Sequence, residues 1–446
     1  MTFSTSNPLP GDSHFTTSNA HSTSALAALV DPQALTTALL SWYDVHKRDL
    51  PWRHTTDPYP IWLSEIMLQQ TRVETVREYF LNFLQIFPSV YALAQAREEE
   101  VLKVWEGLGY YRRARQLHQA AQILVDDYQG VFPRTAKGLQ ALPGIGPYTA
   151  AAIASMAFGE AVPAIDGNLL RIYARMANDH RPIDTKEGRK AAENFFVHLF
   201  ATIAPVASQT FGDNHGSATP NPPSGRSFSD AKGPGDLNQA LMDLGSLLCL
   251  PNGLPLCEAC PWAQACQGRQ ASCAQDLPVR TPKAPRQKEA LTVLLLTWED
   301  RVLVRRRPPQ GLLSNLYEFP HLPGSLTKEE VQQFFSDQSG SIDSLKSPVG
   351  PVEAHESRPW PLGPLTVLPV HRHIFTHREW AMTGFAAPCT RQPSADQVTL
   401  LAQALTPPGQ EMLPLLWASP VDLLERYPVP TAFRSYQEAY LRLVEA

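Results

Sequence analysis

Four cysteines constrain the fold of this chain more than any other feature. Cys249, Cys257, Cys260 and Cys266 follow one another as C-x7-C-x2-C-x5-C within one short segment. An apolar core does not need four thiols so close together, whereas four thiolates suit zinc or an iron–sulfur cluster. A zinc ribbon usually has two C-x2-C pairs and this segment has one, so the spacing favours a [4Fe–4S] cluster. The alternative, a set of disulfides, is disfavoured because we find no secretory signal and the chain is too long to need cross-links.

The composition is that of an ordinary globular protein. The 446 residues are 43% hydrophobic and carry a formal net charge of −5, which permits two domains with apolar cores of their own. The net charge does not indicate a nucleic-acid binder, but local basic groups can act independently of it. With no apolar run long enough to span a bilayer and no signal peptide, we expect no membrane contact and a cytoplasmic location, nucleoid-associated if the source is bacterial.

Changes in residue pattern divide the chain into two domains. Residues 1–32 are rich in Ser, Thr, Asn and Pro, and predict a disordered tail. Residues 33–273 have helical periodicity, interrupted at about 213–235 by a Gly-, Pro- and Ser-rich segment that predicts a flexible insertion. Residues 274–289 are Pro-rich and basic, and predict a linker. Residues 290–446 form the second domain.

The second domain has the pattern of an α+β fold. Residues 291–298 and 302–306 are β-type runs joined by a short polar turn, which indicates a hairpin. Residues 365–375 and 380–386 form a second β-type pair. Residues 324–364 are polar and predict a long loop with at most one helix. The expected fold is therefore an all-α domain with a cysteine loop, followed by an α+β domain.

A glycine-rich turn precedes one of the predicted helices. Leu142-Pro143-Gly144-Ile145-Gly146-Pro147-Tyr148 opens a helix at residues 149–157. Glycines just before a helix let backbone amides approach an anion at the positive helix end. Because residues 135–141 are also helical, the segment predicts a helix-hairpin-helix that grips DNA phosphates. The alternative is a tight turn between two packed helices.

Two carboxylates have surroundings that suit acid–base chemistry. Asp166 precedes a helix and is therefore either an N-cap or a catalytic carboxylate, and the two roles are compatible. On a helix, Glu65 neighbours Ile61, Trp62 and Leu68, and such apolar surroundings favour the neutral carboxyl of a general acid. The alternative is a glutamate at the rim of an apolar stripe. Paired carboxylates suit glycosidic cleavage, in which one protonates the leaving group and the other faces the oxocarbenium ion.

Two further segments combine polar, aromatic and basic side chains. They are Gln69-Gln70-Thr71-Arg72 and Gly107-Leu108-Gly109-Tyr110-Tyr111-Arg112-Arg113. Such side chains can wedge into a base stack and hold phosphates. The alternative is ordinary helix surface and turn chemistry.

These residues occur in the order found in a known family. The chain resembles the adenine DNA glycosylases of the MutY type, within the helix-hairpin-helix superfamily that also contains endonuclease III. The resemblance covers residues 35–285 strongly and residues 288–446 more weakly. Besides the cysteines, it rests on residues 51–53, 62–71, 107–111, 142–148, 164–168 and 238–245.

The resemblance implies an activity and a set of roles. The activity is hydrolysis of the N-glycosidic bond of adenine opposite 8-oxoguanine or guanine in double-stranded DNA, after the adenine is flipped out of the duplex. Glu65 would protonate the adenine and later help to activate water, and Asp166 would stabilise the oxocarbenium centre, with Tyr148 and Asn168 in support. The residues expected to border the adenine are Trp52, Arg53, Leu68 and Gln239, and those expected to contact DNA are Gln69, Gln70, Thr71, Tyr110, Gly144 and Gly146.

Tyr148 distinguishes two kinds of glycosylase. In the bifunctional relatives the matching residue is a lysine, whose amine forms a Schiff base and permits strand cleavage. A phenol cannot do this, so we expect a monofunctional glycosylase. We separately expect the protein to be a monomer. One alternative is an endonuclease III-like glycosylase/lyase acting on damaged pyrimidines. Another is a non-catalytic DNA-binding module, against which the presence of both Glu65 and Asp166 argues.

The second domain resembles the Nudix-like domain with which such glycosylases read 8-oxoguanine. Residues 311–320 fit that domain, but the R-E-x-x-E-E helix with which a Nudix hydrolase holds magnesium is missing from the sequence. Recognition without hydrolysis is therefore expected. The family's Phe-Ser-His loop corresponds to Phe375, Thr376 and His377, and the threonine hydroxyl can make the same hydrogen bonds as serine. For the histidines of this region, plain strand surface is the alternative.

Overall fold

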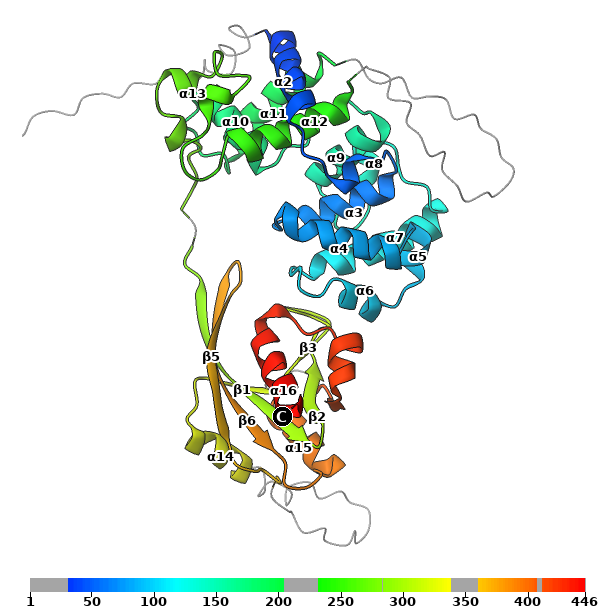
Figure 1. Cartoon of the computed structure of the whole chain (residues 1–446), viewed down its shortest axis with the longest axis vertical. Coiled ribbons are helices and arrows are strands. Elements are labelled where there is room, and N and C mark those ends of the chain that lie inside the picture. Colours follow the sequence, from blue (N-terminus) through cyan, green and yellow to red (C-terminus); the bar gives the residue numbers. More distant parts are fainter. Residues whose placement is uncertain (1–30, 204–231, 283, 338–359, 407–410, 446) are drawn as a thin grey trace, which may run out of the picture. The chain divides into compact units, whose positions relative to one another are not determined.

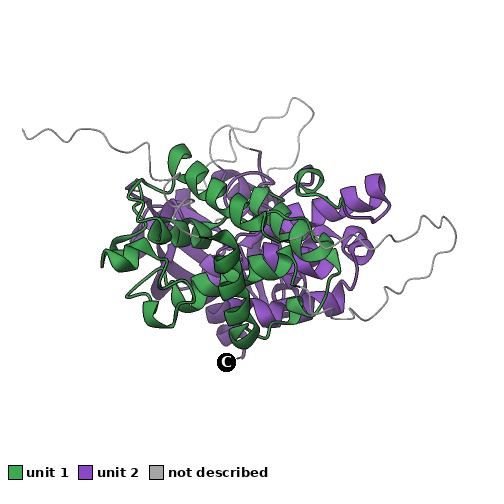
Figure 2. Cartoon of the chain, turned by 90° about the horizontal axis from the view of Figure 1, so that it is seen from above, with its two compact units in different colours: residues 1–58, 133–140, 145–281 green, residues 59–132, 141–144, 282–446 purple. Residues whose placement is uncertain are grey.

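The computed structural model describes residues 31–203, 232–282, 284–337, 360–406 and 411–445 (Figure 1). Nearly all of the expected tail and most of the expected insertion lie outside these residues. The chain divides into two compact units, each assembled from several segments (Figure 2). The first unit comprises residues 1–58, 133–140 and 145–281, and the second comprises residues 59–132, 141–144 and 282–446.

The N-terminal region is helical throughout its described part. The α-helices are α2 (Pro32–His46), α3 (Pro58–Leu68), α4 (Val73–Ile86), α5 (Val90–Gln95), α6 (Glu98–Val104), α7 (Arg112–Tyr128), α8 (Ala136–Leu139), α9 (Pro147–Phe158), α10 (Gly167–Met176), α11 (Lys186–Phe200), α12 (Pro234–Asp243) and α13 (Gln267–Gln270). A 3-10 turn at Pro51–Arg53 lies between α2 and α3, and another at Cys257–Ala259 belongs to the cysteine loop.

Local sequence signals explain where these helices begin. Asp31 caps α2 by accepting a hydrogen bond from the amide of Gln33 at 2.9 Å, and Pro32 occupies the first helical position. Helix α9 begins at Pro147, two residues earlier than predicted, because the ring of proline fits the first turn of a helix. Helix α12 begins in the same way at Pro234.

The first unit is built around one apolar core. Helices α2, α10, α11 and α12 pack together and bury Tyr173, Phe196 and Leu241. Trp262, from the cysteine loop, is 1% exposed and donates its indole N–H to the carbonyl oxygen of Leu35 at 2.9 Å. The cysteine loop is therefore anchored to the first helix of the same core.

In the second unit, helix α3 is buried on nearly every side. Its buried residues run consecutively from Ile61 to Met67, rather than recurring along one stripe, and they include the fully buried Trp62. Phe83 of α4 and Trp105, which follows α6, meet edge to face at 6.0 Å between ring centroids. This surrounding helical layer holds the C-terminal end of α3 in a fixed place within the unit.

The C-terminal region contains a mixed sheet. The strands are β1 (Gln287–Trp298), β2 (Arg301–Arg306), β3 (Tyr317–Glu318), β4 (His321–Pro323), β5 (Thr366–Ile374), β6 (Arg378–Pro388) and β7 (Leu415–Ala418). Their order is β3-β2-β1-β6-β5, with β4 pairing with β1 and β7 with β2. Strands β1 and β6 are parallel, and the other pairs are antiparallel.

Helices cover both faces of this sheet, as Figure 1 shows. Successive residues of β1 alternate between the faces: Val293 and Leu295 join one core, and Leu294 and Leu296 join the other. Helix α16 (Arg434–Glu445) packs on the first face, and α14 (Lys328–Asp337) and α15 (Ala395–Ala404) pack on the second. Burial on both faces explains why β1 is a nearly continuous apolar run.

The expected fold class is confirmed, and some boundaries differ. Both predicted strand pairs form antiparallel hairpins, β1 with β2 and β5 with β6. Strand β1 begins at Gln287, within the residues expected to be a linker, because its first residues pair with β6. Of the region 324–364, expected to hold at most one helix, the structure describes residues 324–337 and 360–364, and α14 is the helix found there. No helix in the described part of the chain is long and apolar enough to cross a membrane.

Candidate functional site

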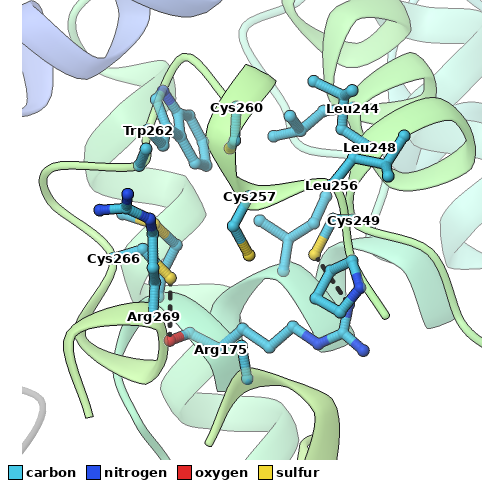
Figure 3. Close-up of a pocket in the computed structure, with 15 residues that line it drawn as sticks. Arg175, Leu244, Leu248, Cys249, Leu256, Cys257, Cys260, Trp262, Cys266 and Arg269 are labelled. Atoms are coloured by element: carbon cyan, nitrogen blue, oxygen red, sulfur yellow. Dashed lines mark hydrogen bonds between the residues drawn. The ribbon is translucent and has the colours of Figure 1, made fainter. Parts of the chain in front are cut away.

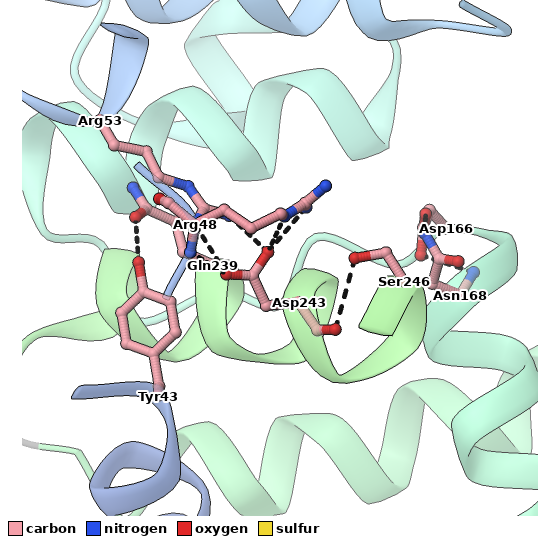
Figure 4. A network of polar contacts seen from close by, with 8 residues as sticks. All are labelled: Tyr43, Arg48, Arg53, Asp166, Asn168, Gln239, Asp243 and Ser246. Atoms are coloured by element: carbon pink, nitrogen blue, oxygen red, sulfur yellow. Dashed lines mark hydrogen bonds and ion pairs between the residues drawn. The ribbon is translucent and has the colours of Figure 1, made fainter. Parts of the chain in front are cut away.

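Asp166 is the N-cap of helix α10. Its carboxylate accepts hydrogen bonds from the amides of Asn168 and Leu169 at 2.8 and 2.9 Å, and from the side-chain amide of Asn168 at 2.7 Å (Figure 4). Burial raises the pKa of Asp166 above its ordinary value, although these hydrogen bonds act in the opposite direction. The carboxylate is therefore oriented by its cap contacts and held away from bulk water.

The side chain of Asn168 is also held by Arg171. Its side-chain oxygen accepts from the guanidinium of Arg171 at 2.9 Å, and the same guanidinium donates to the carbonyl oxygens of Gly245 and Cys249 at 2.8 and 2.7 Å. A Cβ atom at Gly245 would stand 2.8 Å from that of Asn168, closer than side chains can approach. A glycine is therefore required where the end of α12 runs past Asp166 and Asn168.

A second polar network is centred on Asp243, the last residue of α12. Asp243 is fully buried and is paired with Arg53 at 2.7 Å and with Arg48 at 2.6 Å (Figure 4). Burial alone would raise the pKa of Asp243, but the hydrogen bond and charge of Arg53 and the charge of Arg48 outweigh it and lower the pKa. The contact with Arg53 is bidentate, which fixes the plane of its guanidinium.

Tyr43 connects this network to Gln239. Its hydroxyl donates to the side-chain oxygen of Gln239 at 2.6 Å, and the guanidinium of Arg53 lies 5.7 Å from the centre of its ring. Burial raises the pKa of Tyr43 to about 12, so the hydroxyl keeps its proton. Arg53 and Gln239, both expected to border the adenine, are thus brought together by a shared partner.

Sequence reasoning assigned no role to Tyr43, Arg48 or Asp243. The signal that the sequence offered was Asp243, an acidic residue at the C-terminal end of a helical run, because a buried carboxylate needs a cationic partner. The partners lie far away in the sequence: Arg53 and Asp243 are separated by 190 positions. Trp52, expected beside Arg53, is 6% exposed in the same unit.

The turn before α9 has the backbone expected of it. Gly144 has a φ of 77°, which lies in the left-handed region, and Gly146 is the N-cap of α9. Tyr148, in the first turn of the helix, packs against a small apolar cluster that includes Ala164 and Met242. The cluster joins α9 to the segment that leads into Asp166, and Met242 of α12 packs against it as Tyr148 does.

Glu65 lies in α3, which belongs to the second unit. It is 3% exposed within a helix that buries Ile61, Trp62 and Ile66 as well, so it does not lie at a solvent-exposed rim. Asp166 belongs to the first unit, so the two carboxyl groups come from different compact units. Leu68 ends helix α3 and is partly buried.

Two short exposed segments follow in the second unit. After Leu68, Gln70 is exposed and has a φ of 59°, and Thr71 accepts a hydrogen bond from Arg113. In the loop between α6 and α7, Tyr110 is 48% exposed and has a φ of 50°. Non-glycine residues rarely adopt this backbone conformation, and such strain is a reason to suspect function.

The tip of the β5–β6 hairpin carries the segment expected to read the lesion. Phe375 is partly buried, and its ring lies 4.8 Å from that of Trp380 and 4.6 Å from that of His373. Thr376 and His377 are exposed. The aromatic anchor therefore leaves the hydroxyl of Thr376 and the imidazole of His377 on the surface.

The four cysteines line one cavity (Figure 3). Cys249 follows α12, Cys257 and Cys260 bracket a 3-10 turn, and Cys266 precedes α13. None of the four forms a disulfide. Burial, with a smaller effect of the other cysteines, raises the pKa of Cys260 to about 12. A bound cationic centre would offset the unfavourable free energy of bringing four thiolates together.

Positive charge already borders the cavity. Arg175 lies 3.2 Å from the sulfur of Cys249, and its backbone oxygen is 3.4 Å from the sulfur of Cys266. In the parts of the chain that the structure describes, no three His, Cys, Asp or Glu side chains are placed to hold a single metal ion. Four cysteine sulfurs lining one cavity are a donor set that could hold an iron–sulfur cluster or zinc.

Comparison with known proteins finds matches in both regions of the chain. Residues 63–197 match the model of the HhH-GPD superfamily of base excision DNA repair proteins, and residues 292–439 match that of the NUDIX domain. The chain is 33% identical over 401 residues to the adenine DNA glycosylase of Rattus norvegicus, covering 78% of this chain and 69% of the relative. The adenine DNA glycosylase of Mus musculus is 30% identical over 462 residues, and the match covers 92% of this chain and 79% of the relative.

The chain belongs to the adenine DNA glycosylase family. The helix-hairpin-helix and Nudix-like assignments expected from the sequence are thereby confirmed. The adenine DNA glycosylase of Arabidopsis thaliana is 37% identical over 331 residues, which are 65% of this chain. The match spans about half of that relative, 48% of its length. The segment that matches the HhH-GPD model contains Glu65, Asp166 and Tyr148.

Proposed function

We propose that this protein hydrolyses the N-glycosidic bond of adenine mispaired with 8-oxoguanine or guanine in double-stranded DNA. The observation that carries the proposal is the setting of Asp166. Its carboxylate accepts three hydrogen bonds that fix its orientation, and burial raises its pKa. A fixed carboxylate shielded from water stabilises a developing positive charge more strongly than a solvated one.

The reaction separates the roles of the two carboxyl groups. Glu65, buried in an apolar helix, protonates the adenine, which converts it into a neutral leaving group. Asp166 then faces the oxocarbenium centre of the sugar, and water attacks that centre. Asn168 and Arg171 hold Asp166 in position and take no part in proton transfer. Tyr148 has no amine, so no Schiff base forms and the DNA strand stays intact.

Arg53 and Gln239 supply the contacts that select adenine. A glutamine side chain can pair with N6 and N7 of adenine at once, because its amide has both a donor and an acceptor. The hydroxyl of Tyr43 orients the amide of Gln239 by donating to its side-chain oxygen. Asp243 fixes the plane of the Arg53 guanidinium. Trp52 and Leu68 add apolar contacts to the flipped base.

The four cysteines, on this proposal, hold a [4Fe–4S] cluster. When bound, the cluster orders the loop between α12 and α13, and it supplies no step of the hydrolysis. Arg175 balances part of its negative charge through the contact with Cys249. The same loop is tied to the first core by Trp262, so losing the cluster would loosen the packing of α2.

The Nudix-like region reads the base opposite the adenine. Thr376 and His377 present a hydroxyl and an imidazole at the hairpin tip, and Phe375 anchors that tip through Trp380. The proposed layout is a glycosylase domain at 33–273, a linker that ends where β1 begins at Gln287, and a recognition domain that extends from there to residue 446. We further propose that the protein acts as a monomer on duplex DNA in the cytoplasm.

Base release from three matched duplexes tests the proposal. They carry adenine opposite 8-oxoguanine, adenine opposite thymine, and a damaged pyrimidine opposite guanine. We expect release from the first duplex alone, strand breaks only after alkali, and loss of release in Glu65→Gln. Release of the damaged pyrimidine with spontaneous nicking would favour the endonuclease III-like alternative. Tight binding without any release would favour a non-catalytic DNA-binding module.

A further inference from the structure

Arg113 is a buried cation in the first turn of α7. It is 8% exposed, and its guanidinium lies 5.3 Å from the ring centre of Trp105 and 5.4 Å from that of Tyr110. Burial lowers its pKa to about 10, so it remains charged at neutral pH. A guanidinium stacked on two aromatic rings has a fixed plane, which a lysine ammonium would not have.

The hydrogen bonds of Arg113 reach two separate segments. One terminal nitrogen donates to the carbonyl oxygens of Ile66 and Met67 at 2.9 and 2.8 Å, and to that of Gln69. Ile66 and Met67 lie in the last turn of α3, where carbonyls have no partner within the helix. The charge of Arg113 also complements the negative end of the helix dipole.

The other terminal nitrogen reaches the loop between α6 and α7. It donates to the carbonyl oxygens of Leu108 and Gly109 at 3.3 and 3.1 Å, and to the hydroxyl of Thr71 at 3.1 Å. Trp105 supports the same loop by donating its indole N–H to the oxygen of Gly109 at 3.1 Å. A single side chain therefore bridges residues 66–71 and residues 108–109.

Each bridged segment ends in a strained, exposed side chain. Gln70 and Tyr110 have φ values of 59° and 50°, and both side chains face solvent. A non-glycine residue in this region is energetically unfavourable and persists only when its surroundings hold it. The contacts of Arg113 lie directly beside both residues, at Gln69, Thr71 and Gly109.

We propose that Arg113 is a positioning residue that joins the two segments into one rigid wedge for the base stack of duplex DNA. The proposal rests on the proposed function and adds a residue to it. Inserting side chains between bases requires the bases to unstack, which is unfavourable. If Gln70 and Tyr110 moved independently, the entropy lost on ordering them would offset part of the free energy gained from their contacts with DNA. Arg113 therefore acts before the chemical step, while the adenine is being extruded.

The test compares two duplexes under single-turnover conditions. Both carry adenine opposite 8-oxoguanine, and in the second the flanking pairs are mismatched so that stacking is already weakened. Arg113→Lys keeps the positive charge but loses the pair of terminal nitrogens that reach the two segments. We expect it to slow excision about tenfold or more on the paired duplex and less than about threefold on the mismatched one. Arg189→Lys, at an exposed position of α11 outside both segments, is the matched control and should change neither rate.

Equal slowing on both duplexes would overturn the proposal, because a purely structural role affects every substrate alike. Unchanged rates on both would overturn it as well. If the wild-type protein releases no adenine from either duplex, the proposed function fails instead, and this outcome is distinct from the other two.

Hydrogen exchange in the free full-length protein gives a readout independent of activity. Arg113→Lys should speed amide exchange in residues 69–72 and 107–111 together. If that variant does not fold, Thr71→Val removes one acceptor of the guanidinium in the first segment. It should then speed exchange in the second segment, 107–111, and an unchanged second segment would contradict the proposed link.

Discussion

Arg53 and Arg113 are both buried, and the two regions around them hold their charge in opposite ways. Arg53 makes a bidentate pair with the carboxylate of Asp243, so its charge is offset within the region around the proposed adenine contacts. The hydrogen bonds of Arg113 go to carbonyl oxygens and one hydroxyl, which leave its full positive charge in place. The difference suits their proposed partners: Arg53 faces a neutral base, and Arg113 supports segments that approach phosphates.

The largest effect is expected for Asp243→Ala. It leaves the charges of Arg48 and Arg53 without their carboxylate, and breaking a buried pair in this way costs about 3–5 kcal/mol. Urea unfolding should show this loss, whereas Asp49→Ala, at an exposed aspartate, should stay within about 0.5 kcal/mol of wild type. A loss below about 1 kcal/mol for Asp243→Ala would mean that the pair is not the anchor of this region.

A smaller effect is expected for Arg113→Met. The variant removes a charge without stranding an opposite one, and it leaves several carbonyl groups without a donor. Unsatisfied carbonyls cost about 1–3 kcal/mol in total where water can partly replace the donor. The same unfolding experiment should therefore rank Arg113→Met below Asp243→Ala. If Arg113→Met lost more stability than Asp243→Ala, the proposed difference between Arg53 and Arg113 would be contradicted.

Lowering the pH should reduce the stability contribution of Asp243 and leave that of Arg113 unchanged. The pKa of Asp243 is lower in the folded protein than in the unfolded chain, so its contribution to stability is fully present above the unfolded value of about 3.9. That contribution is lost as the pH falls through the lower, folded value. The stability difference between wild type and Asp243→Asn should therefore shrink below about pH 4. The difference for Arg113→Met should stay constant over the same range, because its partners do not titrate there.

The smallest effect is expected for Tyr43→Phe. It removes one hydrogen bond to Gln239 and keeps the ring beneath Arg53, so the loss of stability should be about 1 kcal/mol. Excision of adenine should fall more than excision of purine, which lacks the N6 amino group, because Gln239 would no longer be oriented. An equal fall for both bases would show that Tyr43 does not contribute to selecting adenine.

Features that depend on neighbouring residues were predictable from the sequence. The N-cap at Asp166 follows from an Asp before a helical run, and the β1–β2 hairpin follows from two apolar runs around a short turn. The spacing of the cysteines and the glycines of the turn at 142–148 belong to the same class. In each case the physical cause lies within a few residues of the feature.

Features that depend on distant residues were not predictable. Tyr43 and Gln239 are separated by 196 positions, and Arg113 reaches back 47 positions to Ile66. The parallel pairing of β1 with β6 likewise joins segments that are far apart in the sequence. One sequence carries no record of such pairings, although a buried arginine or aspartate does indicate that some partner exists.

Single-turnover excision of adenine by Asp166→Asn tests the central claim most directly. Asparagine is as good an N-cap as aspartate, so the variant keeps α10 and its fold while losing the negative charge at the reacting centre. We predict unchanged thermal unfolding and a rate about 10²–10³-fold below wild type on adenine opposite 8-oxoguanine. A wild-type rate in the folded variant would show that Asp166 only caps its helix, and would contradict its proposed catalytic role.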